Sequence, residues 1–208
     1  MPNWCNNSIV IEGDKDKIKK IKDVLLSMDK TTTITGIFEA LVGRDENITE
    51  EEFQKGGWYE HNINRYGCKW DANWDDSNVD TDSDDCITMS PDTAWSPPEG
   101  FCKLLAEQYG VNVTLEYSEP GCNFAGKLSV GPDGDIENVT YGFLEGLYHI
   151  DEDYFWIEVQ NNLEYEFDEF EPRPLEEWLE DFQFVSDICK GELIELYNEV
   201  KEQQEQTN

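Results

Sequence analysis

Residues 96–110 read SPPEGFCKLLAEQYG and contain the strongest local signal in the chain. Ser96 and Glu99 have the spacing of a helix capping box, with Pro97 at the first helical position. Gly110 supplies the left-handed residue that commonly ends a helix. This stretch therefore predicts a helix that begins at Ser96 and ends before Gly110. Its mostly apolar face comprises Phe101, Leu104, Leu105, Gln108 and Tyr109.

Strand patterns flank this helix on both sides, and a second helix follows the first strand. The apolar face of that helix carries Ile18, Ile21, Leu25 and Met28, after a cap at Asp14 or Asp16. The predicted strands are 4–12, 66–71, 86–89, 111–117 and 124–130, with 136–141 pairing back as a hairpin. This order predicts an α+β fold of the split βαβ, or ferredoxin-like, type. Two helices would pack on one face of an antiparallel sheet.

The chain divides into a core and a C-terminal extension. We expect residues 1–141 to form the ferredoxin-like core, with an insertion at about 31–61 and an acidic loop at 71–85. Residues 142–208 form an acidic, largely helical extension. Within it, the pattern allows short strands at 154–157 and 163–167, a helix opening at Pro174, a break at Lys190-Gly191 and a last helix that contains Leu193, Ile194, Leu196, Tyr197 and Val200.

Charge is the most unusual feature of the composition. The 208 residues include 47 acidic and 15 basic side chains, for a net charge of −32. Residues 1–70 hold 12 acidic and 10 basic residues, whereas residues 71–208 hold 35 and 5. An aromatic content of 12% indicates a folded protein, since disordered acidic chains are poor in aromatics. Direct nucleic-acid binding requires a basic footprint, which the chain lacks.

The start of the chain and its cysteines indicate a cytoplasmic protein of a bacterial cell. The first residues lack the basic start and apolar run of a signal peptide, and no stretch approaches the about 18 apolar residues of a membrane span. The six cysteines include no Cys-x-x-Cys pair, so we expect reduced, mostly structural thiols.

Five short motifs occur in one order along roughly residues 1–130. They are Met1-Pro2-Asn3-Trp4-Cys5-x-Asn7, Gly67-x-Lys69-Trp70-Asp71, Thr93-Ala94-Trp95-Ser96-Pro97-Pro98, Tyr117-x-Glu119-Pro120-Gly121 and Phe124-Ala125-Gly126. With this set, the chain resembles the YubB-type ferredoxin-like family of phage and plasmid proteins. The resemblance implies a ferredoxin-like core and an origin on a bacterial mobile element. It supplies no catalytic residues.

The sequence favours neither a metal site nor a catalytic site. His61 and His149 are the two histidines, and neither has a cysteine at metal-ligand spacing. Residues 80–84 match three positions of a calcium loop, but Asp85 stands where glycine is needed and Pro91 where a bidentate glutamate is needed. No nucleophile, phosphate-loop or metalloprotease motif is present. We therefore predict no cofactor, no metal and no enzymatic activity.

The tryptophans suggest packing and one partner contact. Trp4, Trp70 and Trp95 lie in the motifs, and we expect core or near-core positions for them. Trp74 lies within the acidic loop. It either anchors a partner, as tryptophans at interfaces often do, or folds back onto the sheet.

These features lead to a hypothesis of nucleic-acid mimicry. The acidic surface would occupy the basic groove of a host nucleic-acid-handling defence protein, such as a restriction, CRISPR or repair nuclease, and inhibit it. The alternatives are a protein stabilised by calcium or magnesium, an enzyme with a carboxylate site, and an acidic accessory protein whose charge only keeps it soluble. The predicted partner-binding residues are Trp74, Asp75, Asp76, Asp80, Asp82, Asp84 and Asp85, with a second patch of Glu164, Glu166, Asp168, Glu169 and Glu171.

Overall fold

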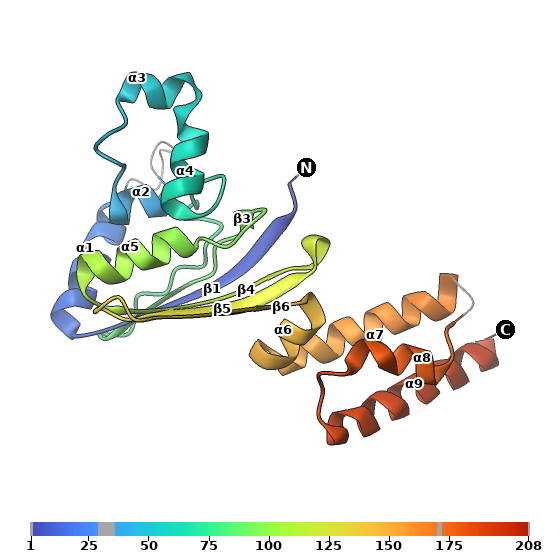
Figure 1. Cartoon of the computed structure of the whole chain (residues 1–208). Helices are drawn as coiled ribbons and strands as arrows, with labels where there is room; N and C mark the ends of the chain where they lie inside the picture. The colour runs from blue at the N-terminus through green and yellow to red at the C-terminus, as the bar shows by residue number, and fades with distance from the viewer. Residues whose placement is uncertain (1, 29–35, 170–171, 208) are drawn as a thin grey trace. The chain divides into compact units, whose positions relative to one another are not determined.

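The computed structural model describes residues 2–28, 36–169 and 172–207, which fold as two compact units. The N-terminal unit is Met1–Thr140 and the C-terminal unit is Tyr141–Asn208. Figure 1 shows both strands and helices in the N-terminal unit. In the C-terminal unit, the elements that follow Tyr141 are helices. None of the helices in these described ranges has both the length and the apolar character needed to cross a membrane.

The N-terminal unit is built on an antiparallel sheet in the order β2-β1-β4-β5-β6, with β3 pairing separately with β1. In register, Ile9 lies opposite Met89 on one side and Leu115 on the other, and Leu115 lies opposite Leu128. All four are fully buried, so this row forms the floor of the core. The strands are β1 (Trp4–Glu12), β2 (Cys86–Met89), β3 (Thr93–Ala94), β4 (Asn112–Glu119), β5 (Phe124–Val130) and β6 (Ile136–Tyr141).

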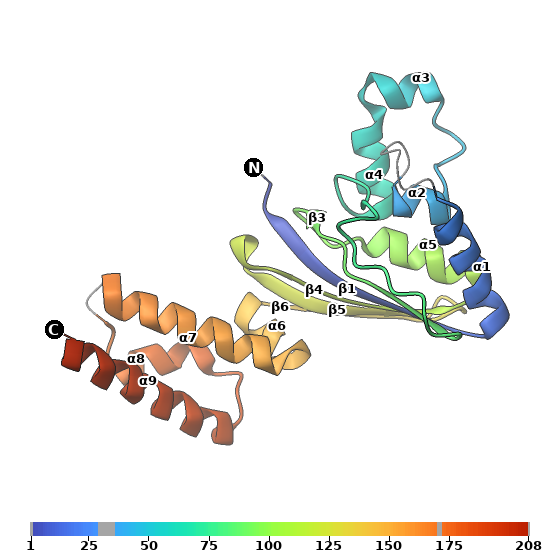
Figure 2. The ribbon, with the colours of Figure 1, turned by 180° about the vertical axis from the view of Figure 1, so that it is seen from behind.

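Three helices cover one face of this sheet, as the two opposite views in Figures 1 and 2 show. They are α1 (Lys15–Ser27), α2 (Ile37–Val42) and α5 (Glu99–Tyr109). In α1, Ile18, Ile21 and Leu25 are fully buried, as their helical spacing predicts. The α+β fold with helices on one face of an antiparallel sheet is therefore confirmed.

The strand predicted at residues 66–71 is wrong. Tyr66 is the last residue of α4 (Trp58–Tyr66), and Gly67 ends that helix with a φ of 90°. The predicted capping box at Ser96 is also wrong, because α5 begins at Glu99. The hydroxyl of Ser96 instead donates to the carbonyl of Gly67 at 2.7 Å, so it connects two chain segments and does not cap a helix. The predicted end of α5 at Gly110 is confirmed.

The insertion forms a helical segment above the sheet layer (Figure 1). It contains α2, α3 (Glu50–Glu52), the π-helix η1 (Phe53–Gly57) and α4. Thr49 and Glu52 form the reciprocal capping box that starts α3. The insertion packs closely on the core: Phe38 of α2 stacks on Phe101 of α5 with ring centroids 4.2 Å apart, and a Cβ added to Gly100 would lie 2.4 Å from the carbonyl oxygen of Arg65. The first residues of the predicted insertion, 31–35, lie outside the described residues.

The C-terminal unit is helical and has its own aromatic core. Trp178 packs on Phe182 and Tyr197 with ring centroids 4.7 and 5.5 Å apart. The strands predicted at 154–157 and 163–167 are wrong, because both segments lie within α7. The elements are α6 (Phe143–Ile150), α7 (Glu152–Glu169), α8 (Leu175–Trp178), the 3-10 helix η3 (Leu179–Phe182) and α9 (Asp187–Thr207).

Two further predictions concern the last two helices of this unit. The expected helix opening at Pro174 is confirmed, since Pro174 is the N-cap of α8. The expected break at Lys190-Gly191 is wrong, because α9 runs through it. A Cβ at Gly191 would meet nothing within 4 Å, so this glycine imposes no turn. Leu193, Tyr197 and Val200 are buried, which confirms that this helix docks.

Candidate functional site

The acidic loop, residues 71–85, is held against the outer edge of β2 by its backbone. Asp80 and Thr88 exchange two backbone hydrogen bonds of 2.9 and 3.1 Å and so form an isolated β-bridge. Ser77 is buried, and its carbonyl accepts the amide of Ser90 at 2.6 Å. The loop is therefore attached to the sheet at its middle as well as at its ends.

Further contacts fix the tip of the acidic loop. The amide of Gly13 donates to the carbonyl of Asp85 at 3.1 Å, which joins the end of the loop to the turn after β1. The amide of Asp82 donates to Oδ1 of Asp80 at 2.9 Å, and the hydroxyl of Ser83 donates to Oδ1 of Asp85 at 2.7 Å. These contacts order the loop and leave carboxylate oxygens directed to solvent.

All six aspartates predicted as partner-binding residues of the acidic loop are exposed. They are Asp75, Asp76, Asp80, Asp82, Asp84 and Asp85. Asp84 forms an ion pair with Lys15 at 3.0 Å, but both side chains are more than two thirds exposed, so solvent screens the pair and it contributes little to stability. In the described part of the chain, the other five form no ion pair with lysine or arginine.

Trp74 takes the packing alternative. Its side chain is half-buried and packs against the hydrophobic core. The ring is therefore not fully exposed, and a contact of Trp74 with a partner stays a prediction. A large apolar ring beside a sheet edge is stabilised more by covering the core than by contact with water.

The second predicted patch lies on the C-terminal unit, whereas the acidic loop lies on the N-terminal unit. The carboxylate of Glu166 accepts hydrogen bonds from Nε and Nη2 of Arg173 at 3.0 and 3.2 Å. These hydrogen bonds lower the pKa of Glu166. Glu164 accepts the side-chain amide of Gln160 at 2.7 Å. Oδ1 of Asp168 accepts a hydrogen bond from the side-chain amide of Gln204. These hydrogen bonds all lie within the C-terminal unit. The Glu169 side chain and Glu171 lie outside the described residues.

The three motif tryptophans are exposed, contrary to the prediction of core positions. Trp4, Trp70 and Trp95 have exposed fractions of 48%, 37% and 46%. Alternation along β1 explains the first case: Cys5 lies on the buried face of the strand, which places Trp4 on the opposite face. That alternation was present in the sequence. Trp4 and Trp70 lie in contact, with ring centroids 5.9 Å apart and planes inclined by 45°.

A pocket of about 630 Å³ opens beside these two rings. Trp4 and Trp70 line it together with Asp76 of the acidic loop and Asp92, which follows β2. Burial, and then repulsion from Asp76, raise the pKa of Asp92 above its usual value. Sequence reasoning placed Asp76 on the surface but missed the pocket, because Trp4, Trp70 and Asp92 are distant in sequence.

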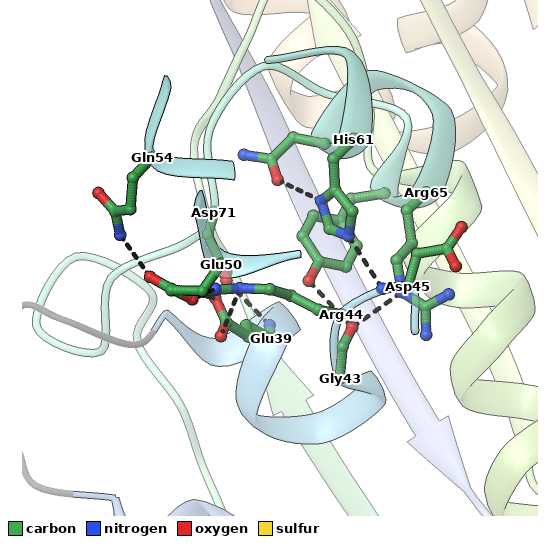
Figure 3. Close-up of polar contacts among 11 residues, drawn as sticks. Glu39, Gly43, Arg44, Asp45, Glu50, Gln54, His61, Arg65 and Asp71 are labelled. Carbon is green, nitrogen blue, oxygen red and sulfur yellow. Dashed lines mark hydrogen bonds and ion pairs between the residues drawn. The ribbon is translucent and has the colours of Figure 1, made fainter. Parts of the chain in front are cut away.

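A second pocket, of about 640 Å³, lies at the insertion and includes His61 in its wall. Both ring nitrogens of His61 are occupied (Figure 3). Nε2 accepts the backbone amide of Asp45 at 3.1 Å, and Nδ1 contacts Oδ1 of Asn62 at 2.9 Å. The histidine is therefore a packing and hydrogen-bonding residue. Within the described ranges, no group of three or more histidine, cysteine and acidic side chains could hold a metal ion.

The same region contains an arginine network drawn in Figure 3. Arg44 pairs with Glu39 at 2.9 Å and with Glu50, and its guanidinium lies 3.8 Å from the centroid of Phe53. Arg65 donates to the carbonyl of Gly43 at 2.8 Å. These contacts join α2 to η1 and α4.

Asp71, the first residue of the acidic loop, connects this loop to the N-terminus of α2 in the insertion. Its two carboxylate oxygens accept the amides of Phe38 and Glu39 at 2.7 and 2.9 Å, at the N-terminus of α2. The amide of Ala72 donates to the same carboxylate at 2.7 Å. Burial raises the pKa of Asp71 to about 6, against the lowering effect of these donors. The motif aspartate is therefore a cap supplied from outside the helix that it caps.

A comparison with family models agrees with this architecture. A family model described as a ferredoxin-like domain in Api92-like protein matches residues 69–171. The chain has a ferredoxin-like fold. A crystal structure of protein api92 from Yersinia pseudotuberculosis is also similar, with a TM-score of 0.42 and 10% identity over 68% of this chain and 99% of that chain. No curated protein matches the chain.

Proposed function

We propose that the protein is a non-enzymatic acidic binding protein that occupies the basic nucleic-acid groove of a bacterial nucleic-acid-handling protein. The target class is a restriction, CRISPR or repair nuclease, which the protein inhibits by competing with DNA or RNA. The resemblance of its motifs to YubB-type proteins supports an origin on a phage or plasmid, where such an inhibitor protects the incoming element. The protein acts in the bacterial cytoplasm.

The observation that carries this proposal is the fixed arrangement of the acidic loop. Backbone hydrogen bonds at Ser77, Asp80 and Asp85 attach it to the rest of the unit, while its aspartates remain exposed. A polyanion that is already ordered loses little conformational entropy when it binds. Among the residues that the structure describes, five of the loop's carboxylates form no ion pair with a lysine or arginine, so they are able to meet cations of another protein.

Electrostatics give this surface its competitive character. Duplex DNA carries one negative charge per about 1.7 Å of its axis, so proteins that bind it present matching lysines and arginines. Carboxylates on the loop would contact the same side chains and exclude DNA. Association between such opposite surfaces is fast and weakens steeply with salt.

The test is capture from bacterial lysate on the immobilised full chain, followed by elution with duplex DNA at constant ionic strength. We expect a nucleic-acid enzyme to be captured, to be released by DNA, and to lose activity when the purified protein is added in stoichiometric amounts. The informative variant neutralises loop carboxylates that make no ion pair: Asp75→Asn, Asp80→Asn, Asp82→Asn and Asp85→Asn. Asparagine keeps the oxygen that Asp80 and Asp85 use within the loop.

A matched control neutralises four other exposed acids of the same unit: Glu107→Gln, Asp133→Asn, Asp135→Asn and Glu137→Gln. Both variants change the net charge equally. Mimicry by the acidic loop requires that the loop variant loses capture and the control keeps it. Equal capture by both variants would contradict the proposal and leave an acidic accessory protein. Equal loss would show that bulk charge, not the loop, binds the partner.

A further inference from the structure

The pocket formed by Trp4, Trp70, Asp76 and Asp92, here called the Trp4–Trp70 pocket, adjoins the acidic loop through Asp76. Its volume of about 630 Å³ exceeds what a single side chain fills. Asn73 and Asn78 add polar groups to its wall. It therefore combines indole rings, carboxylates and amides in one concave site.

The two indole rings supply a surface suited to a cation. The rings of Trp4 and Trp70 are both more than a third exposed and lie in contact, and aromatic side chains are enriched at protein interfaces. The face of an indole ring attracts cations because its π-electrons are negative. Trp70 already shows this behaviour within the chain: Nζ of Lys69 lies over its ring, 4.5 Å from the centroid.

The carboxylates of the pocket favour the same ligand. Neither Asp76 nor Asp92 forms an ion pair with a lysine or arginine among the residues that the structure describes. Repulsion between them contributes to the raised pKa of Asp92. A cation placed between them would remove this repulsion and would be held from two sides.

We propose that the Trp4–Trp70 pocket receives an arginine side chain of the partner protein. The chemistry favours arginine over lysine, because a planar guanidinium stacks on indole rings, is more weakly hydrated than an ammonium, and donates in a fork to carboxylates. Arginine is also a residue that nucleic-acid grooves use for phosphates. The inference rests on the proposed function, since it assigns the pocket to the same basic partner as the acidic loop.

The test is an NMR titration of the full chain labelled with ¹⁵N at the tryptophan indoles. The ligand is the capped tripeptide acetyl-Gly-Arg-Gly-amide, and the control ligand carries citrulline, which has nearly the same shape without the charge. We expect saturable shifts of the Trp4 and Trp70 indole resonances with the arginine peptide and no shift with the citrulline peptide. A third peptide, with lysine in place of arginine, should bind more weakly than the arginine peptide. Trp178 of the C-terminal unit should not respond.

Variants connect the shifts to the pocket. The pair Asp76→Asn and Asp92→Asn should weaken arginine binding on the order of tenfold, because two charge-assisted contacts are lost. Trp70→Leu should weaken it roughly two- to fivefold, the size of one exposed cation–π contact. Asp133→Asn with Asp135→Asn, which changes charge equally on the hairpin turn, should have no effect. An unchanged indole spectrum outside the pocket confirms that each variant is folded.

The outcomes separate this inference from the proposed function. Equal shifts with arginine and citrulline peptides, or equal weakening by the pocket and hairpin variants, would overturn the assignment of the pocket. The four-residue loop variant keeps Asp76 and should still bind the arginine peptide. If arginine binds in the pocket but lysate capture fails, the pocket assignment stands and mimicry falls. If DNA-sensitive capture succeeds without arginine binding, mimicry stands and the pocket assignment falls.

Discussion

The carboxylate of Asp71 accepts the backbone amide of Phe38 at 2.7 Å across 33 residues of sequence. This contact caps α2, whose own N-cap residue, Gly36, has no side chain to do so. The two positions fit tightly, because a Cβ at Gly36 would lie 2.2 Å from Cγ of Asp71. One motif aspartate thus fixes both the first turn of the insertion helix and the start of the acidic loop.

Replacing this cap should destabilise the N-terminal unit. Asp71→Ala leaves the amides of Phe38, Glu39 and Ala72 without their acceptor, so we expect a loss of about 2–4 kcal/mol in the free energy of unfolding. Asp71→Asn keeps one oxygen and should lose less. Urea denaturation measures both. The exposed Asp133→Ala should stay within about 0.5 kcal/mol of the unmodified protein, and a similar value for Asp71→Ala would contradict the capping role.

The same residue should give the stability a characteristic pH dependence. The pKa of Asp71 is raised from 3.8 to about 6, so the folded state binds a proton that the unfolded state has lost between these values. Its contribution to stability therefore falls as pH rises through this window. The measurement is the difference in unfolding free energy between the unmodified protein and Asp71→Asn. The unfolding free energy of the unmodified protein should increase relative to that of Asp71→Asn from pH 6 towards pH 4. The opposite trend would contradict the raised pKa of Asp71.

The pair of Glu166 and Arg173 should stabilise the C-terminal unit with the opposite pH dependence. The hydrogen bond from Arg173 lowers the pKa of Glu166, so the stabilisation is present above the usual glutamate pKa and is lost as pH falls through the lowered value. Arg173→Met should cost about 1–2 kcal/mol at neutral pH and little in acid. Lys201→Met, at an exposed position of α9, serves as the control. An equal loss at both pH values would show that packing, not charge, is responsible.

Calcium should not stabilise the protein. The acidic loop directs Asp84 to Lys15, and it holds Asp80 and Asp85 in hydrogen bonds within the loop. Its carboxylates therefore do not surround one point, as six to eight oxygen ligands of calcium must. Calorimetric titration should give no binding heat, and calcium or a chelator should leave the melting temperature unchanged. A saturable heat of binding would restore the cation-stabilised alternative.

Thiol labelling should distinguish one cysteine from the rest. Cys122 is exposed, whereas Cys5, Cys68, Cys102 and Cys189 are buried and Cys86 is partly covered. Glu119 raises the pKa of the Cys122 thiol, so its reaction at neutral pH should be slower than that of a free thiol. We expect a disulfide reagent to modify one thiol per native chain. This modification should be absent in Cys122→Ser. Fast modification of several thiols in the folded protein would contradict the described burial.

Much of the sheet was predictable, because its strands have clear local patterns. The predicted strands 4–12, 124–130 and 136–141 have the observed bounds of β1, β5 and β6. The segment 66–71 failed because its alternation competes with long-range contacts. Gly67 ends a helix there, and Asp71 is required at the start of α2.

The errors in the C-terminal unit have a different origin. Residues 154–157 and 163–167 are rich in aromatic and β-branched side chains, which favour strands locally. Phe155, Val159 and Leu163 are nevertheless buried at intervals of four residues along α7. This spacing was visible in the sequence and predicts a helix. Packing of the unit's aromatic core therefore overrides the local preference.

The candidate site was predictable only in part. The aspartates of the acidic loop follow from composition alone, whereas the pocket needs Trp4, Trp70 and Asp92 to meet from three distant segments. Exposure of these tryptophans contradicts the usual expectation for large rings, and the sequence indicates it only for Trp4, through the alternation of β1.

Because backbone groups at Ser77, Asp80 and Asp85 attach the acidic loop, the exposed side chains of Asp75, Asp76 and Asp82 are not needed to hold it on the sheet. Substitutions at these positions therefore leave the strands of the sheet unchanged. If the acidic loop binds the partner as proposed, exchanging the side chains at these three positions should change the choice of target without rebuilding the fold.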